Sequence, residues 1–117
     1  MNSLLLLFCG VFIGIAASFT GLGGGFLMVP LLMALGYSAQ RAVGTSFAAI
    51  LVIALSALIA HNKFANVDWR AGIMLGLGGI IGAQIGPYLL EGLSTEHFRK
   101  IFALVLCGLA VYLFMHD

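Results

Sequence analysis

Four of the five residues from Gly21 to Gly25 are glycines, and they interrupt an apolar stretch that has no charged residue before Arg41. A glycine inside a helix costs about 1 kcal/mol relative to alanine, so a cluster this dense predicts a break in the helix. At membrane depth, non-helical backbone survives only where it is buried in protein or lines a cavity, because its N–H and C=O groups need partners. The position of this break therefore restricts how the neighbouring helices are arranged.

The composition predicts a membrane protein. The 117 residues are 62% hydrophobic and 8% charged, whereas soluble domains contain about 25% charged residues. A hydrocarbon core about 30 Å thick requires about 20 residues per helix, so the length allows about four spans and a half-span. The net charge of +1 gives no basic surface for nucleic acid. We expect an all-α, polytopic bundle that forms a single transmembrane domain over residues 1–117.

Hydropathy and turn signals divide this bundle into segments. We expect spans over residues 4–19, 42–60, 71–90 and 98–115, the first being a retained helix and not a cleaved signal, since no positive charge precedes it. A helix over residues 26–35 would be about 15 Å long, too short to cross. Residues 20–36 are thus predicted to form a turn plus a half-helix, either re-entrant or one arm of a discontinuous helix.

The glycine break also suggests a ligand. A fresh helix start presents backbone N–H groups without partners at a positive helix end, which suits an anion. The candidate substrate-binding residues here are Gly21, Gly23, Gly24, Gly25 and Phe26.

A second candidate group lies one turn into the next span, at Gly44, Thr45 and Ser46. Two interpretations remain open. The small residues can serve close helix packing, with the hydroxyls bonded back to the carbonyls of their own helix. Alternatively, the two hydroxyls are donors that face a polar cavity.

The remaining polar residues are interpreted mostly as structural. We expect Asp68 and Ser94 to cap helices, Trp69 to anchor at the interface, and His61 to be a solvated interfacial group, with pH sensing or ligand binding as the alternative. The glycines at 78, 82 and 86 form a stripe that lets another helix approach closely, and Gln84 is expected to hydrogen-bond between helices.

The loop charges give a weak indication of orientation. Arg41, Arg99 and Lys100 should lie at one end of the bundle, and Lys63 and Arg70 at the other. Because positive loops favour the cytoplasm, we prefer an orientation with Arg41 inside. The difference of three against two leaves insertion in both orientations open.

Several functions are disfavoured. Cys9 and Cys107 lie in apolar runs without metal-ligand spacing, and no nucleophile–base pair lies within the predicted spans, so we expect neither an enzyme nor a metal or cofactor. The glycine run lacks the Gly-Lys-Ser/Thr end of a P-loop, and Phe26 stands where a dinucleotide fingerprint has Gly or Ala. Asp68 and Glu91 are predicted at interfaces, so no membrane-buried carboxylate offers itself for a driving proton or for a cationic drug.

An ordered set of motifs points to a family. These are Gly21-x-Gly-Gly-Gly25, Val29-Pro30, Ala42-Val-Gly-Thr-Ser46, Val67-Asp-Trp-Arg70 and the glycines from 78 to 86. In this order the sequence resembles the sulfite exporter TauE/SafE family over nearly its whole length. The resemblance implies a bacterial inner-membrane transporter for sulfite, sulfonates or related organosulfur anions, working without ATP.

Members of that family usually carry two such repeats, and this sequence contains one. The resemblance therefore implies a homodimer, pairing with another half-size chain, or a truncated and inactive relative. We expect a half-size permease or exporter in the lipid bilayer that takes a small anionic substrate. The alternative is a non-transporting membrane subunit whose partner supplies the site.

Overall fold

The computed structural model describes residues 3–116, which form five helices joined by short turns. They are α1 (Ser3–Thr20), α2 (Gly25–Ala34), α3 (Ala39–Lys63), α4 (Trp69–Glu91) and α5 (Thr95–Met115). All except the ten-residue α2 are long and apolar enough to cross a membrane. The predicted all-α bundle of about four spans, with a half-helix after the first, is confirmed.

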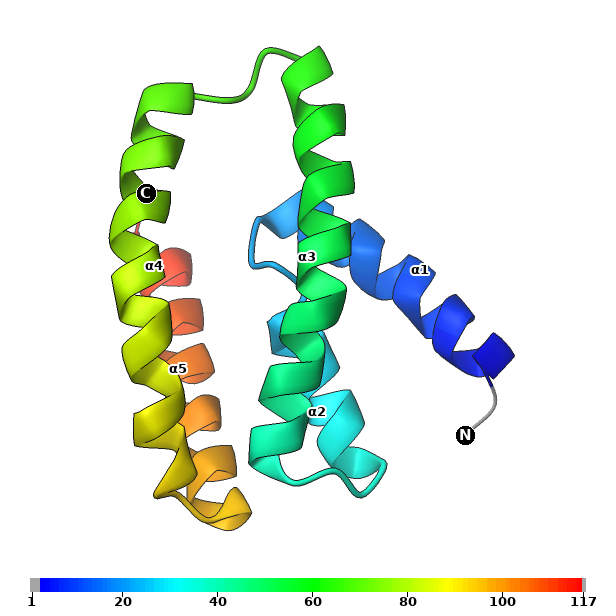
Figure 1. The fold of residues 1–117 in the computed structure, drawn as a ribbon, viewed down its shortest axis with the longest axis vertical. Helices are drawn as coiled ribbons and strands as arrows, with labels where there is room; N and C mark the ends of the chain where they lie inside the picture. Colours follow the sequence, from blue (N-terminus) through cyan, green and yellow to red (C-terminus); the bar gives the residue numbers. More distant parts are fainter. Residues whose placement is uncertain (1–2, 117) are drawn as a thin grey trace.

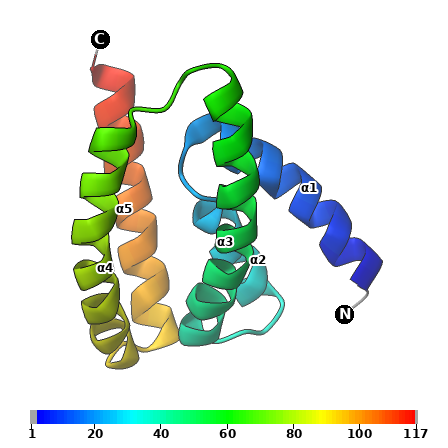
Figure 2. The same ribbon diagram turned by 45° about the horizontal axis from the view of Figure 1, so that its top comes forward.

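Helix α3 lies between the α1–α2 pair and the α4–α5 pair (Figures 1 and 2). Helix α1 crosses α3 obliquely (Figure 1), with the two helices running in the same general direction: Gly10 and Val52 line one cavity, and Ser18 contacts His61 further along both helices. Helix α2 runs the other way, since Gly25 faces Ile50 and Leu32 packs against Ala42 near the start of α3. Residues 20–36 therefore return the chain toward the end at which α3 begins.

Left-handed glycines make this reversal possible. Gly21, Gly23 and Gly24 have φ angles of +79°, +79° and +86°, a region that glycine adopts without the steric cost that a side chain would bring. Before them, the Thr20 hydroxyl donates to the Ala16 carbonyl and accepts from Leu22 N. Helix α1 thus ends in a side-chain-stabilised turn.

The buried core lies among the first three helices. Its apolar members are aliphatic side chains and one methionine: Ile13, Ala17, Met28, Val29, Leu32, Ala39 and Ala42. Phe98 and Phe102 of α5 pack against its edge. Helix α4 contributes no buried residue, and neither does α5. The α4–α5 pair is therefore attached to a core that it does little to build.

Polar contacts at one end of the bundle attach this pair. Gln40 Nε2 donates to the carbonyls of Leu90, at 3.0 Å, and Leu93, at 2.9 Å. The amide of Ala39 donates to Thr95 Oγ1 at 3.1 Å. These bonds bring the turn before α3 and the turn between α4 and α5 to the same end of the molecule.

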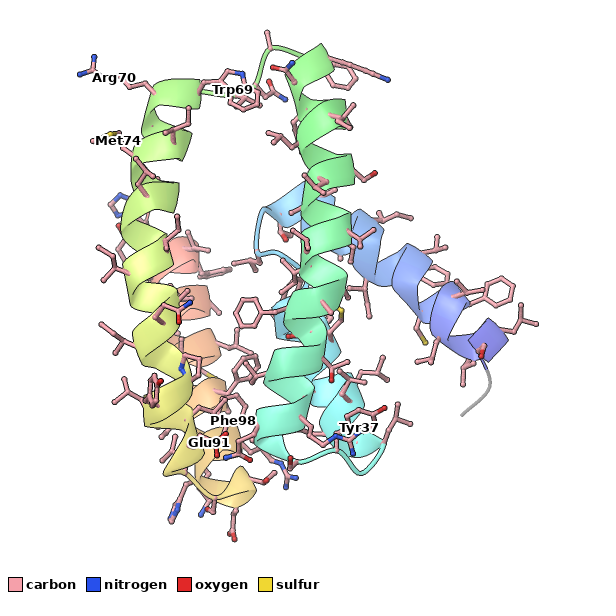
Figure 3. The ribbon with its side chains drawn as sticks, in the orientation of Figure 1. Tyr37, Trp69, Arg70, Met74, Glu91 and Phe98 are labelled. Atoms are coloured by element: carbon pink, nitrogen blue, oxygen red, sulfur yellow. The ribbon has the colours of Figure 1, made fainter. Side chains whose placement is uncertain are left out.

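The charged loops lie as predicted. Tyr37, Glu91 and Phe98 gather at the end just described, and Trp69 and Arg70 lie at the opposite end (Figure 3). Arg41 stacks over the Tyr37 ring at 4.7 Å. The positively charged residues at the first end are thus separated from Arg70 by the length of the spans.

Three side chains cap the helices. Asp68 Oδ1 accepts from Ala71 N at 3.1 Å, and Ser94 Oγ accepts from His97 N at 3.2 Å, which confirms both predicted caps. Ser38 Oγ accepts from Arg41 N. Because Ser38 acts as a cap, α3 begins at Ala39 and not at residue 42, where the hydrophobic run alone had placed it.

The glycine stripe of α4 faces away from the rest of the described chain. No atom lies within 4 Å of the position that a Cβ would take at Gly78, Gly82 or Gly86. Gln84 on the same helix is also exposed. Within residues 3–116, the close helix approach predicted for this stripe is not made.

The Gln40 contacts can be tested by substitution. Gln40→Leu removes two donated hydrogen bonds, each with a net contribution of about 0.5–1.5 kcal/mol, so we expect a clear fall in the melting temperature in detergent. Gln84→Leu is the matched control, because that amide makes no hydrogen bond within the described chain. Equal melting temperatures for the two variants would show that the Gln40 bonds do not hold the α4–α5 pair.

Candidate functional site

The glycine turn opens onto a cavity of about 420 Å³. The cavity lies between the end of α1, the second half of α3 and the loop before α4. Two of the left-handed glycines, Gly21 and Gly23, line it. Its polar side chains come from three parts of the chain: Ser18, His61, Asn66 and Asp68. Backbone that only glycine readily adopts therefore meets polar groups on one surface.

The start of α2 offers donors beside this turn. The first N–H groups of a helix have no intrahelical partner, and Gly24, the N-cap, has no side chain to accept from them. Within the described residues, the amides of Gly25 and Phe26 make no other hydrogen bond. Together with the positive pole of the helix dipole, these amides can bind an oxyanion.

Gly24 and Gly25 differ in the space around them. A Cβ on Gly24 would lie 3.1 Å from Met28 Cε and 3.2 Å from Ile13 Cγ2, while one on Gly25 would make an ordinary contact of 3.6 Å with Ile50 Cδ1. Gly24 is therefore needed for packing as well as for its backbone angle. Gly25 has room for a side chain.

The hydroxyls of Thr45 and Ser46 in α3 differ in their contacts. Ser46 is buried and donates to the Val43 carbonyl at 2.7 Å, so its proton is used inside its own helix. The Thr45 hydroxyl makes no hydrogen bond within the described chain. It lines a cavity of about 210 Å³ whose other lining residues are almost all apolar. Gly44 is exposed and has open space around it.

The predicted site residues are therefore not all brought together. Gly21 and Gly23 line the cavity of about 420 Å³, and Thr45 lines the cavity of about 210 Å³, beside Met28 and other residues of α1 and α2. Phe26 is half-buried. Within the described chain, the two candidate groups thus line separate cavities and do not form a single shell around one site.

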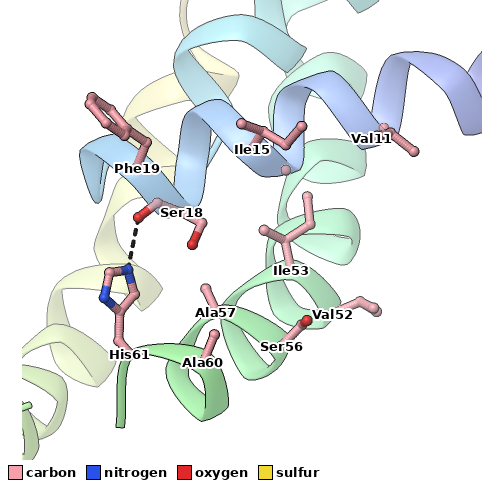
Figure 4. A pocket seen from close by; sticks show the side chains of 12 residues that line it. Val11, Ile15, Ser18, Phe19, Val52, Ile53, Ser56, Ala57, Ala60 and His61 are labelled. Atoms are coloured by element: carbon pink, nitrogen blue, oxygen red, sulfur yellow. Dashed lines mark hydrogen bonds between the residues drawn. The ribbon is translucent and has the colours of Figure 1, made fainter. Parts of the chain in front are cut away.

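His61 differs from its expected solvated position. It is half-buried, and its Nε2 lies 2.9 Å from the Ser18 carbonyl at the end of α1 (Figure 4). Its Nδ1 lies 3.4 Å from Asn66 Nδ2. The partner Ser18 is 43 positions away in the sequence, so no local pattern could have identified this contact.

Comparison with known proteins identifies the family. The family model described as "Sulfite exporter TauE/SafE" matches residues 6–117. The chain belongs to this family. It is accordingly a multi-pass membrane protein of a transporter family and not an enzyme.

Several membrane transporter proteins are similar to this chain over most of its length. The "Probable membrane transporter protein YunE" of Bacillus subtilis is 29% identical over 98% of the chain and 45% of the relative. The "Probable membrane transporter protein MJ0441" of Methanocaldococcus jannaschii is 28% identical over 93% of the chain and 43% of the relative. A "Probable membrane transporter protein" of Haemophilus influenzae is 32% identical over 96% of the chain and 43% of the relative. The chain thus spans less than half the length of these relatives. No solved structure matches it.

The glycine turn yields a stability prediction. Gly24→Ala places a side chain in left-handed backbone, which costs about 1–2 kcal/mol, and also crowds Met28 and Ile13. We expect a lower melting temperature in detergent. Gly108→Ala is the control, because that glycine has open space around it and alanine favours helix. If Gly24→Ala melted at or above the wild-type temperature, the turn would not need glycine at this position.

Proposed function

We propose that the chain forms half of a secondary transporter for small anions, with sulfite, sulfonates or related organosulfur compounds as the substrate class, and that it acts as a dimer. The observation that carries the proposal is the free amide pair of Gly25 and Phe26 at the start of α2, beside left-handed glycines that line a cavity with four polar side chains. The family description, a sulfite exporter, supports the substrate class.

Recognition of the anion would depend on dipoles. The 420 Å³ cavity has no lysine or arginine in its lining, and its one carboxylate, Asp68, already accepts from the first turn of α4. An anion held by backbone amides without a full countercharge binds with modest affinity. Such affinity suits a transporter, which must release its substrate on the far side.

Two observations support the dimer. The chain covers only 43–45% of the length of relatives such as MJ0441 and YunE, so a second copy would supply a comparable number of spans. Helix α4 also exposes large apolar side chains, with Leu75 77% and Tyr88 81% accessible. A second chain or lipid must cover them in the bilayer.

A second candidate function is a membrane subunit that does not transport by itself. It is favoured by the separation of the glycine turn and Thr45 into two cavities, because another chain would then complete the site. Purification of this chain with a second membrane protein, combined with an absence of flux from the chain alone, would favour this alternative.

The anion site is tested by flux of sulfite and short sulfonates into proteoliposomes that contain only the purified chain. We expect saturable flux from the wild type and its loss in Gly25→Leu. The leucine side chain would cover the amides, and the backbone at Gly25, which is not left-handed, accepts a side chain. Gly108→Leu, on an open surface of α5, should transport normally. Normal flux in well-inserted Gly25→Leu would contradict the anion site.

The hydroxyl pair gives a second test. Thr45→Val removes a hydroxyl that has no internal partner, and we expect it to lower flux. Ser46→Ala removes one that already donates to Val43, and flux should stay near wild type. If both variants transport at the wild-type rate, neither hydroxyl contacts the substrate and the triplet serves helix packing.

A further inference from the structure

His61 lies where two cavities meet. The 420 Å³ cavity beside the glycine turn and a second cavity of about 700 Å³ along α1 and α3 have four lining residues in common. These are Ser18, Ile53, Ala57 and His61. The imidazole crosses from α3 to the end of α1 at this boundary (Figure 4). A change in its contacts would therefore change the wall between the cavities.

The neighbours of His61 select one protonation state. The Ser18 carbonyl can only accept, so the Nε2 atom at 2.9 Å must carry a proton. The Asn66 Nδ2 group donates, so the Nδ1 atom at 3.4 Å must have a free lone pair. Both contacts are satisfied together only by the neutral imidazole with its proton on Nε2.

A second proton breaks this arrangement. Protonation of Nδ1 sets an N–H group against the N–H group of Asn66, and the Asn66 amide must turn or move away. Asn66 belongs to a tight loop in which its backbone N donates to the His61 carbonyl at 3.2 Å. Ala65 in this loop has a φ of +56°, which strains a residue with a side chain. Asn66 is therefore tied to His61 through its backbone as well as through its side chain.

The surroundings can accept the extra charge. Helices α1 and α3 both end beside His61, and C-terminal helix ends interact favourably with cations. Asp68 lines the same cavity. The other charged groups near this end are Lys63, in the last turn of α3, and Arg70, in the first turn of α4; neither α1 nor α2 contains a charged residue.

We propose that His61 is a proton-binding site that controls the opening beside the glycine turn. In the neutral state it ties the end of α1 to α3 and fixes Asn66. When Nδ1 is protonated, the Nδ2 contact is lost, and the Asn66 amide, in the loop that forms one wall of the 420 Å³ cavity, turns or moves away. The role of this proton in transport rests on the proposed function, whereas the binding site itself does not.

The single tryptophan provides a probe close to the site. Trp69 is the one tryptophan in the chain, and its Nε1 donates to Asn62 Oδ1 at 3.2 Å, next to His61. We would follow Trp69 fluorescence of the full chain in vesicles between pH 5 and pH 8, about the range in which histidine changes charge. No substrate is needed.

His61→Gln is the decisive variant, because a glutamine amide can still donate to the Ser18 carbonyl but does not titrate. We expect a fluorescence transition in the wild type that is lost in His61→Gln. His97→Gln and His116→Gln, which alter the other two histidines, should keep it. A transition that persists in His61→Gln, or is absent from the wild type, overturns the proposal.

A second measurement avoids the need for a variant. Nitrogen NMR of the wild type with ¹⁵N-labelled histidine reports which ring nitrogen carries the proton. At a pH above the transition we expect one histidine fixed with its proton on Nε2, becoming doubly protonated as the pH falls. A His61 signal with the proton on Nδ1 at high pH, or no titration, overturns the proposal even if His61→Gln does not fold.

Flux measurements separate this proposal from the proposed function. If the fluorescence transition follows His61 but the chain transports no anion, the proton site stands and the transport function falls. If anions are transported and the flux in His61→Gln keeps the wild-type dependence on pH, the proton site does not act in transport and that part of the proposal is overturned.

Discussion

The constraint on which this structure depends is the reversal of the backbone between α1 and α2. In lipid, a chain that leaves the helical conformation must be enclosed by protein. Three glycines with positive φ make the reversal within a few residues, and Ile13, Ala17 and Met28 close around Gly24. Part of the core of the first three helices thus packs against the turn, and the same turn leaves the amides at the start of α2 without partners within the described chain.

The two parts of the molecule are held by different interactions. Helices α1, α2 and α3 bury aliphatic side chains and a methionine against each other. The α4–α5 pair is held chiefly by the hydrogen bonds of Gln40 and Thr95 at one end and by the edge contacts of Phe98 and Phe102. Apolar burial is not a strong driving force between helices in lipid, so a pair held at one end can keep its glycine stripe available to another chain.

The sequence predicts features that depend on neighbouring residues. Hydrophobic length located the spans, the glycine cluster located the break, and Asp68 and Ser94 marked helix starts. Ser38 was missed as a cap because the apolar run begins after it. The sequence did not reveal that Thr45 is free while Ser46 bonds to Val43, or that His61 reaches Ser18. Those differences depend on how α1 is placed against α3, which no local pattern encodes.

The proton site lines the same cavity as the glycine turn that precedes the candidate anion site, and this has an energetic consequence. Gly21 and Gly23 line it from the turn, and His61 lines it from α3. A protonated imidazole would add a positive charge to a cavity whose lining contains no lysine or arginine, so it would strengthen anion binding. Because coupling between two bound ligands is reciprocal, the anion must then strengthen proton binding by the same factor. A lone histidine beside a glycine turn would in this way couple a proton to an anion without a membrane-buried carboxylate.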